Sequence, residues 1–260
     1  MSSNLPRIIF VINSQEQSSL AFNENSEQLF NNKDVGIILY PLEDNSSSSD
    51  CYPGEDLVNK LQQQGLIQTG NILIKSPFND DYALATDASQ TFALAKHSIF
   101  TELCGYLGAK EVLVNEVKIN NKTKKSLFKT KLEIDGVTKL VPADVNTERE
   151  EAEKIEIQVE LRTKFAGSNP NFTAVNQLLT NTQLENDQYM KSLVGLRQME
   201  NLAQEQEVSL NLSRESNVNF KIGASLLAKF PSLLEVNGIA EYQSSIQNVT
   251  EYNFRYKVTF

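Results

Sequence analysis

The stretch at residues 154–165 reads KIEIQVELRTKF and alternates between apolar and polar side chains along most of its length. Successive side chains of an extended strand point to opposite faces, so this strand would have one apolar and one polar face. Antiparallel sheets that lie on a core with one face in solvent are built from such strands. The stretch therefore predicts an antiparallel sheet with one wet face.

The same alternation recurs in the carboxyl-terminal half of the chain. It is found in five further segments: 128–134, 208–212, 218–226, 234–242 and 252–260. The first of them is followed by Asp135 and Gly136, a pair that favours a tight hairpin turn. We expect all five segments to be strands.

The strand candidates before residue 110 have a different pattern. They are continuous apolar runs at residues 7–13 (RIIFVIN), 35–40 (VGIILY) and 71–75 (NILIK). Strands that are covered on both faces have such runs. We expect helices to pack against them.

Three helical segments are expected. The first spans residues 55–64, with Pro53 and Gly54 before it and Gly65 after it. The second spans residues 87–107; Asp87 could cap its start, Gly108 ends it, and its wide apolar face indicates a central, largely buried helix.

The third segment is a helix pair at residues 173–203, which should cover the dry face of the sheet. The apolar stripe expected on its second helix consists of Tyr189, Leu193, Leu196, Met199 and Leu202.

These patterns together predict an α+β fold. Residues 1–110 would form an N-terminal region of buried strands with a long central helix. Residues 111–260 would form a large curved antiparallel sheet backed by the helix pair. Because no linker rich in Pro, Gly or Ser separates the regions, we expect one continuous domain.

Composition restricts the classes of partner and compartment. The 260 residues carry a net charge of −9, which disfavours nucleic acid as a partner. The apolar run near the amino terminus is too short for a signal-peptide core, and no stretch is long enough for a membrane-spanning helix. We expect an acidic cytoplasmic protein with Cys51 and Cys104 reduced; its many asparagines and lysines suggest a microbial source.

Few residues are suited to catalysis. His97 is the single histidine, and Cys104 follows two helical turns later, about 10 Å along the axis, which is beyond hydrogen-bond reach. Paired metal-binding cysteines and glycine-rich phosphate loops are absent from the sequence. We therefore expect no cofactor, no metal site and no enzymatic activity, although a carboxylate-based hydrolase would leave no mark in the sequence.

A cluster of lysines is the local exception in an acidic chain, and it is a candidate interaction surface. Its members are Lys118, Lys122, Lys124, Lys125, Lys129 and Lys131. The alternative interpretation is a solvated hairpin whose charges prevent aggregation between sheet edges.

The function that we expect is a non-enzymatic cytoplasmic protein that binds another protein or assembles with itself. The main alternative is an effector that is stored soluble and inserts β-hairpins into membranes, because pore-forming strands also have one apolar and one polar face. The candidate membrane-insertion residues are Phe220, Ile222, Tyr242, Phe254 and Tyr256.

Overall fold

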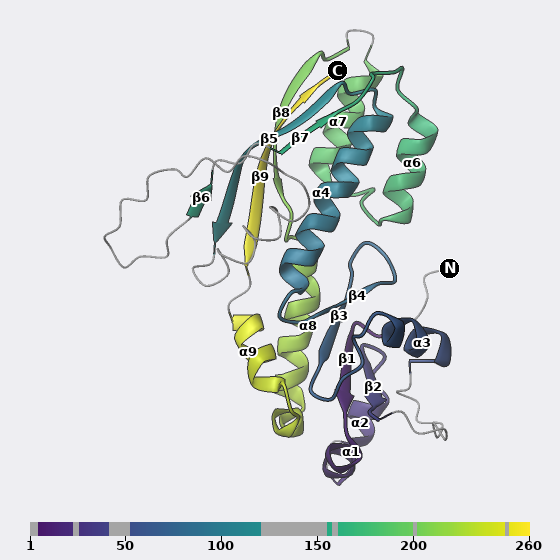
Figure 1. Ribbon diagram of the computed structural model, residues 1–260, viewed down its shortest axis with the longest axis vertical. Coiled ribbons are helices and arrows are strands. Elements are labelled where there is room, and N and C mark those ends of the chain that lie inside the picture. Colours follow the sequence, from purple (N-terminus) through teal and green to yellow (C-terminus); the bar gives the residue numbers. More distant parts are fainter. Residues whose placement is uncertain are drawn as a thin grey trace, which may run out of the picture. The chain divides into compact units, whose positions relative to one another are not determined.

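A computed structural model describes residues 5–22, 26–41, 53–120, 155–157, 161–199, 202–247 and 250–260. It is a mixed α+β protein with two sheets, which confirms the predicted fold class (Figure 1). The chain forms two compact units, Met1–Ser89 with Glu215–Val249 and Gln90–Arg214 with Thr250–Phe260. The division into regions 1–110 and 111–260 of one domain stays a prediction.

The first unit contains a mixed sheet with strand order β2-β1-β3-β4. Its strands are β1 (Ile8–Ile12), β2 (Val35–Leu39), β3 (Ile72–Lys75) and β4 (Tyr82–Leu84). Strands β1 and β2 are parallel, whereas β1 with β3 and β3 with β4 are antiparallel. The three strands predicted before residue 110 are therefore confirmed.

One face of this sheet is covered by helix α3 (Glu55–Gln63), whose Leu57 and Leu61 pack with Ile9 and Val11 of β1. Gly54 and Gly65 flank the helix with φ angles of 90° and 71°, a conformation that glycine adopts without strain. The predicted helix is confirmed. The short helices α1 (Ser14–Ala21) and α2 (Ser26–Phe30) connect β1 with β2.

The opposite face is covered by helices α8 (Ser216–Lys229) and α9 (Ile239–Gln247), which come from the carboxyl-terminal part of the chain. The Tyr242 ring of α9 meets Phe10 of β1 edge to face at 6.5 Å. A Cβ atom on Gly223 of α8 would lie 1.6 Å from the Tyr242 hydroxyl and 3.1 Å from Ile8, so only glycine fits this contact.

The strand prediction for residues 218–226 and 234–242 is therefore wrong. The first segment lies in α8, and the second covers parts of the 3₁₀ helix η1 (Pro231–Glu235) and of α9. The buried residues of α8 recur at helical spacing: Ser216, Asn219, Phe220, Gly223, Leu226 and Leu227. Two of them are polar and one is glycine, which hid the helical period from a search for apolar residues.

The second unit contains an antiparallel sheet with strand order β6-β5-β9-β8, in which β7 also pairs with β5. Its strands are β5 (Glu111–Asn120), β6 (Ile155–Ile157), β7 (Leu161–Lys164), β8 (Glu205–Asn211) and β9 (Glu251–Thr259). Tyr252, Phe254, Tyr256 and Val258 of β9 are fully buried, and the residues between them are not.

The predicted one-sided sheet is therefore confirmed at residues 252–260, at 208–212 and at 161–165, and residues 155–157 are confirmed as a strand. The predicted strand at 128–134 and the turn at Asp135 and Gly136 lie outside the described residues.

Three helices lie on the apolar side of this sheet: α4 (Ala88–Tyr106), α6 (Phe172–Asn181) and α7 (Gln188–Gln198). The rings of Phe100 in α4 and Tyr256 in β9 are 4.5 Å apart, and the Arg197 guanidinium of α7 lies 4.2 Å over the Phe260 ring. The long helix and the helix pair are confirmed as helices. Helix α4 contacts strand β9, and α7 contacts Phe260, the residue that follows β9.

The predicted apolar stripe on α7 is only partly correct. Leu193 is buried, but Tyr189, Met199 and Leu202 are exposed. The side chains that α7 buries are Met190, Leu193, Val194 and Arg197. The buried face is rotated because Arg197 packs inward on Phe260, a role that its charge concealed.

Candidate functional site

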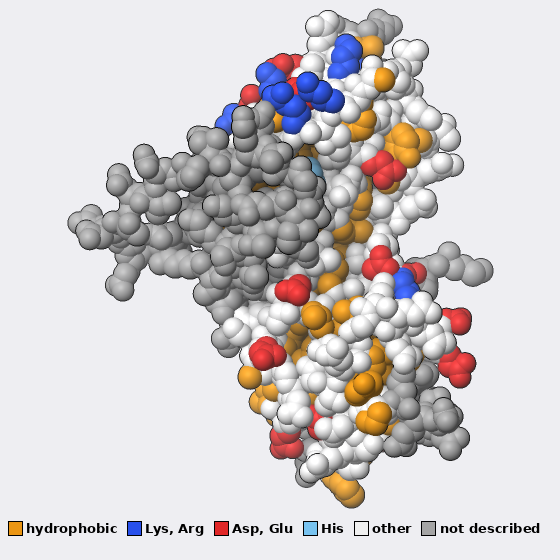
Figure 2. Space-filling model, in the orientation of Figure 1, with side chains coloured by type: hydrophobic (Ala, Val, Ile, Leu, Met, Phe, Trp, Pro, Cys, Tyr) orange, Lys and Arg blue, Asp and Glu red, His pale blue; other side chains and the backbone are white. Residues whose placement is uncertain are grey.

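The outer face of the antiparallel sheet is covered with charged side chains of both signs. Lys257 of β9 pairs with Glu205 of β8 at 3.0 Å, and Arg255 of β9 pairs with Glu207 of β8 at 2.7 Å. Arg162 of β7 lies 3.4 Å from Glu111 of β5. Figure 2 shows Lys, Arg, Asp and Glu side chains gathered over the upper part of this sheet. The face is therefore polar and close to neutral.

Strand β8 forms one edge of this sheet, and among the described residues no strand pairs with its outer side. The backbone N–H of Leu212 donates to the carbonyl of Tyr252, and that of Phe260 donates to the carbonyl of Gln204. With the register of β8 and β9, these two bonds show that the even-numbered residues of β8 are the ones that bond to β9. In an antiparallel pair alternate residues bond to the neighbour. The backbone N–H groups of Glu205, Glu207 and Ser209 therefore point away from β9.

Side chains along this edge differ between the two sides of the sheet. Glu205 and Glu207 project to the polar side and are about half exposed, at 52% and 51% of their side-chain surface. On the apolar side Val208 is only partly buried. Met199 and Leu202, in the segment that leads into β8, are 56% and 45% exposed. The edge thus offers acidic groups on one side and apolar surface near its start.

The far end of β8 is fixed by a buried ion pair. Lys96 of α4, which is 1% exposed, lies 2.8 Å from the carboxylate of Asp187, the N-cap residue of α7. Lys96 also donates a hydrogen bond to the backbone carbonyl of Asn211, the last residue of β8. One ammonium group therefore ties two helices to the edge strand.

Asp187 is ionised in this arrangement. Burial raises the pKa of its carboxyl, but the hydrogen bond and the charge of Lys96 lower it, as do the N–H groups of Met190 and Tyr189, so that the pKa lies below its ordinary value. The carboxylate accepts hydrogen bonds from both of these N–H groups. It therefore caps α7 while it neutralises Lys96.

His97 follows Lys96 in the sequence, but its side chain faces the sheet. Its Nδ1 atom is 2.9 Å from the Tyr256 hydroxyl, and its ring stacks on the Tyr256 ring at 5.8 Å. Burial lowers the pKa of His97 to about 4, so the imidazole is neutral at pH 7. Cys104 is a fully buried free thiol whose pKa is raised by burial. Cys104 lies in the core of the second unit, and His97 is partly buried at its margin.

Of the predicted lysine cluster, only Lys118 lies in the described part of the chain. It is on β5 and pairs with Glu116 at 2.9 Å. Lys122, Lys124, Lys125, Lys129 and Lys131 lie outside the described residues. The cluster as an interaction surface stays a prediction.

The candidate membrane-insertion residues lie in two kinds of element. Phe220 and Ile222 are on α8 and Tyr242 is on α9, so the prediction that they belong to strands is wrong. Phe254 and Tyr256 are on β9 as expected, and both are fully buried. Membrane perturbation stays a prediction that dye leakage from liposomes would test.

The position of β8 at a sheet edge and the ion pair behind it were not expected from the sequence. Residues 208–212 alternate and predict a strand, but strand order, which makes β8 an edge, is not readable from the alternation. The sequence does indicate that Lys96 is unusual, since it is a single cation within a largely apolar helix. Its partner Asp187 lies 91 residues away and could not be identified.

Two kinds of site are not found in the part of the chain that the structure describes. It holds no cluster of three or more His, Cys, Asp or Glu side chains that could bind a metal ion. None of its helices combines the length and the apolar character needed to cross a bilayer. No family model, curated protein or solved structure matches the chain.

Proposed function

We propose that the protein is a non-enzymatic binding protein, and that a partner protein adds an extended strand to the outer edge of β8. The observation that carries the proposal is the outward direction of the backbone N–H groups of Glu205, Glu207 and Ser209, with no described strand opposite them. Strand addition to an open sheet edge supplies affinity through main-chain hydrogen bonds.

The side chains of β8 favour one kind of partner strand. Glu205 and Glu207 project from the same side, and each is half exposed although it pairs with a cation of β9. A partner strand with Lys or Arg at alternate positions would approach these carboxylates, and apolar residues between them would contact Val208. Two copies of β8 would instead bring glutamates together, so self-pairing at this edge is disfavoured.

Rigidity of the edge also supports the proposal. The ion pair of Lys96 with Asp187 and the hydrogen bond from Lys96 to Asn211 hold the end of β8 in place before any partner arrives. A preorganised strand loses less conformational freedom on binding. We propose the cytoplasm as the compartment, where a free thiol such as Cys104 stays reduced.

The test is a proline substitution at the edge. Ser209→Pro removes an N–H group that points away from β9, so the sheet itself should tolerate it. The matched control, Ser209→Thr, retains the N–H group and the β-strand preference. Tagged wild type and both variants are used to retain proteins from the lysate of the native host, followed by mass spectrometry.

The expected result is a stoichiometric partner that wild type and Ser209→Thr retain and Ser209→Pro loses. Equal recovery of that partner by Ser209→Pro would show that binding does not use the edge. Circular dichroism of the two variants establishes that the comparison is made between folded proteins.

A further inference from the structure

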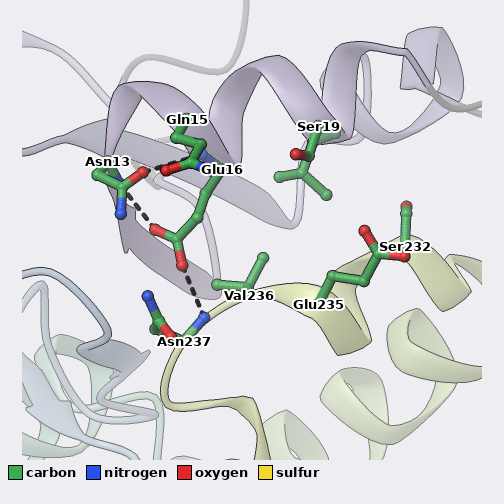
Figure 3. Close-up of a pocket in the computed structure, with 9 residues that line it drawn as sticks. Asn13, Gln15, Glu16, Ser19, Ser232, Glu235, Val236 and Asn237 are labelled. Carbon is green, nitrogen blue, oxygen red and sulfur yellow. Dashed lines mark hydrogen bonds between the residues drawn. The ribbon is translucent and has the colours of Figure 1, made fainter.

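A cavity of about 260 Å³ lies in the first unit, between helix α1 and the turn that leads from η1 into α9. Its walls are polar on both sides (Figure 3). Asn13, Glu16 and Ser19 line one wall, and Ser232, Glu235 and Asn237 line the other. This volume lies just below the range of most small-molecule sites, so the cavity suits a small ligand.

Glu16 is held in a fixed position in this cavity. One carboxylate oxygen accepts a hydrogen bond from the backbone N–H of Asn13 at 2.9 Å, as part of the capping box of α1. The other accepts from the backbone N–H of Asn237 at 2.8 Å (Figure 3). Each oxygen of a carboxylate can accept a second hydrogen bond. Glu16 is therefore an anchored anion with acceptor capacity left for a ligand.

Glu235 supplies a second carboxylate from the opposite wall. It is exposed and forms no ion pair with any described residue. The lining includes no Lys or Arg, so nothing within it offsets the two negative charges. Such a site favours a ligand with positive charge.

The two apolar residues of the lining offer little surface to a ligand. Leu20 of α1 and Val236 after η1 line the cavity and are themselves 2% and 4% exposed, so they are firmly packed in the fold. Polar hydroxyl groups of Ser19 and Ser232 lie nearby. The charged ends of a ligand would contact the carboxylates, and its methylene groups would span the space between them.

We propose that this cavity binds a small aliphatic diamine. One ammonium group donates hydrogen bonds to Glu16, the other donates to Glu235, and the aliphatic chain between them spans the cavity. Hydrogen bonds between an ammonium group and a carboxylate are the strong, charge-assisted kind. The site lies in the first unit and does not depend on the strand-binding edge of the second.

The experiment uses the full chain labelled with ¹⁵N and titrated with 1,4-diaminobutane, followed by amide chemical shifts and by calorimetry. We expect saturable shifts at Ser19, Glu235 and Asn237. Glu235→Gln should weaken binding by roughly tenfold or more, because it removes one charge-assisted contact. Glu235 has an exposed side chain, so this variant should fold. 1-Aminobutane, which has one ammonium group, should bind wild type more weakly than the diamine.

Glu27→Gln is the matched control, since Glu27 is exposed on α2 in the same unit and does not line the cavity. It should leave the affinity unchanged. The proposal is overturned if the diamine causes no saturable shifts, if Glu27→Gln weakens binding as much as Glu235→Gln, or if the shifts lie away from the cavity. The Ser209→Pro test reports on a different unit, so either proposal can fail without the other.

Discussion

The two sheets of this protein differ in the number of faces that are covered. Every residue of β1 is buried, because α3 packs on one face of its sheet and α8 with α9 on the other. In β9, by contrast, buried residues alternate with partly exposed ones, because the helices of the described part of the chain lie on one face only. A continuous apolar run thus indicates a strand covered twice, and an alternating run indicates a strand covered once.

The second unit also contains a buried ion pair beside the exposed pairs of its outer sheet face. In the first unit the pairs of Arg7 with Asp34 and of Lys60 with Asp81 are roughly half exposed. The second unit buries the pair of Lys96 with Asp187 almost completely. Exposed pairs contribute little to stability, whereas a buried charge that loses its partner is costly. Substitutions should therefore act very differently at the buried pair and at the exposed pairs.

The largest effect is expected for Asp187→Asn. The amide can still cap α7, but it removes the negative charge that lies 2.8 Å from the buried ammonium of Lys96, so unfolding should become easier by about 3–5 kcal/mol. Asp34→Asn in the first unit is the control and should cost less than about 1 kcal/mol. Urea unfolding measures both. A loss at Asp187 no larger than at Asp34 would contradict the contrast between the buried and the exposed pairs.

Substitutions at two glycines, one in each unit, compare a crowded helix position with an open one. Gly223→Ala in α8 forces a methyl group onto the Tyr242 hydroxyl and should destabilise the protein by about 1–3 kcal/mol. Gly195→Ala in α7 places the same methyl group in open space and should stabilise it by up to about 1 kcal/mol. Thermal unfolding of both variants measures the difference.

The Tyr242 hydroxyl offers a second check, since it is buried without a hydrogen-bond partner among the described residues. Tyr242→Phe removes it and should restore part of the stability lost in Gly223→Ala. If Gly223→Ala were neutral, α8 would not be packed against the first sheet as closely as the distances indicate.

His97 makes the second unit sensitive to acid. Its pKa is lowered from 6.5 to about 4 in the folded chain. The unfolded chain therefore binds a proton first as the pH falls below 6.5, and the folded state loses stability until the pH reaches about 4. The expected loss between pH 7 and pH 5 is about 2 kcal/mol. Urea unfolding at several pH values measures it, and His97→Gln should flatten this part of the profile; an unchanged slope would contradict a buried neutral imidazole.

Much of the fold was predictable because its patterns are local. The apolar run of β1, the alternation of β9 and the glycines around α3 each depend on a few neighbouring residues. The strand prediction for residues 218–226 failed because Phe220, Ile222 and Leu226 fit the period of two of a strand. The buried face of the helix includes Asn219 and Gly223 as well. Asn219 is buried because its amide donates to the backbone carbonyl of Lys75, a contact 144 residues away.

The candidate sites were less predictable for the same reason. Glu205 and Glu207 matter because β8 lies at an edge, and strand order follows from tertiary packing. Glu16 was readable as part of a capping box with Asn13, but its bond to Asn237 joins residues 221 positions apart. Local sequence can indicate which residues cap or alternate, and it does not reveal which distant segment they meet.

The smallest effect is expected for Glu205→Gln on the outer face of the second sheet. Glu205 pairs with Lys257 across the strand, and both side chains are well exposed, so the change should cost less than about 1 kcal/mol. Urea unfolding at low and high salt measures it, and the difference from wild type should shrink as salt screens the pair. A much larger, salt-independent loss would mean that this face is covered in solution. The sheet would then be shielded on both faces, and the contrast with β1 would hold only for the isolated chain.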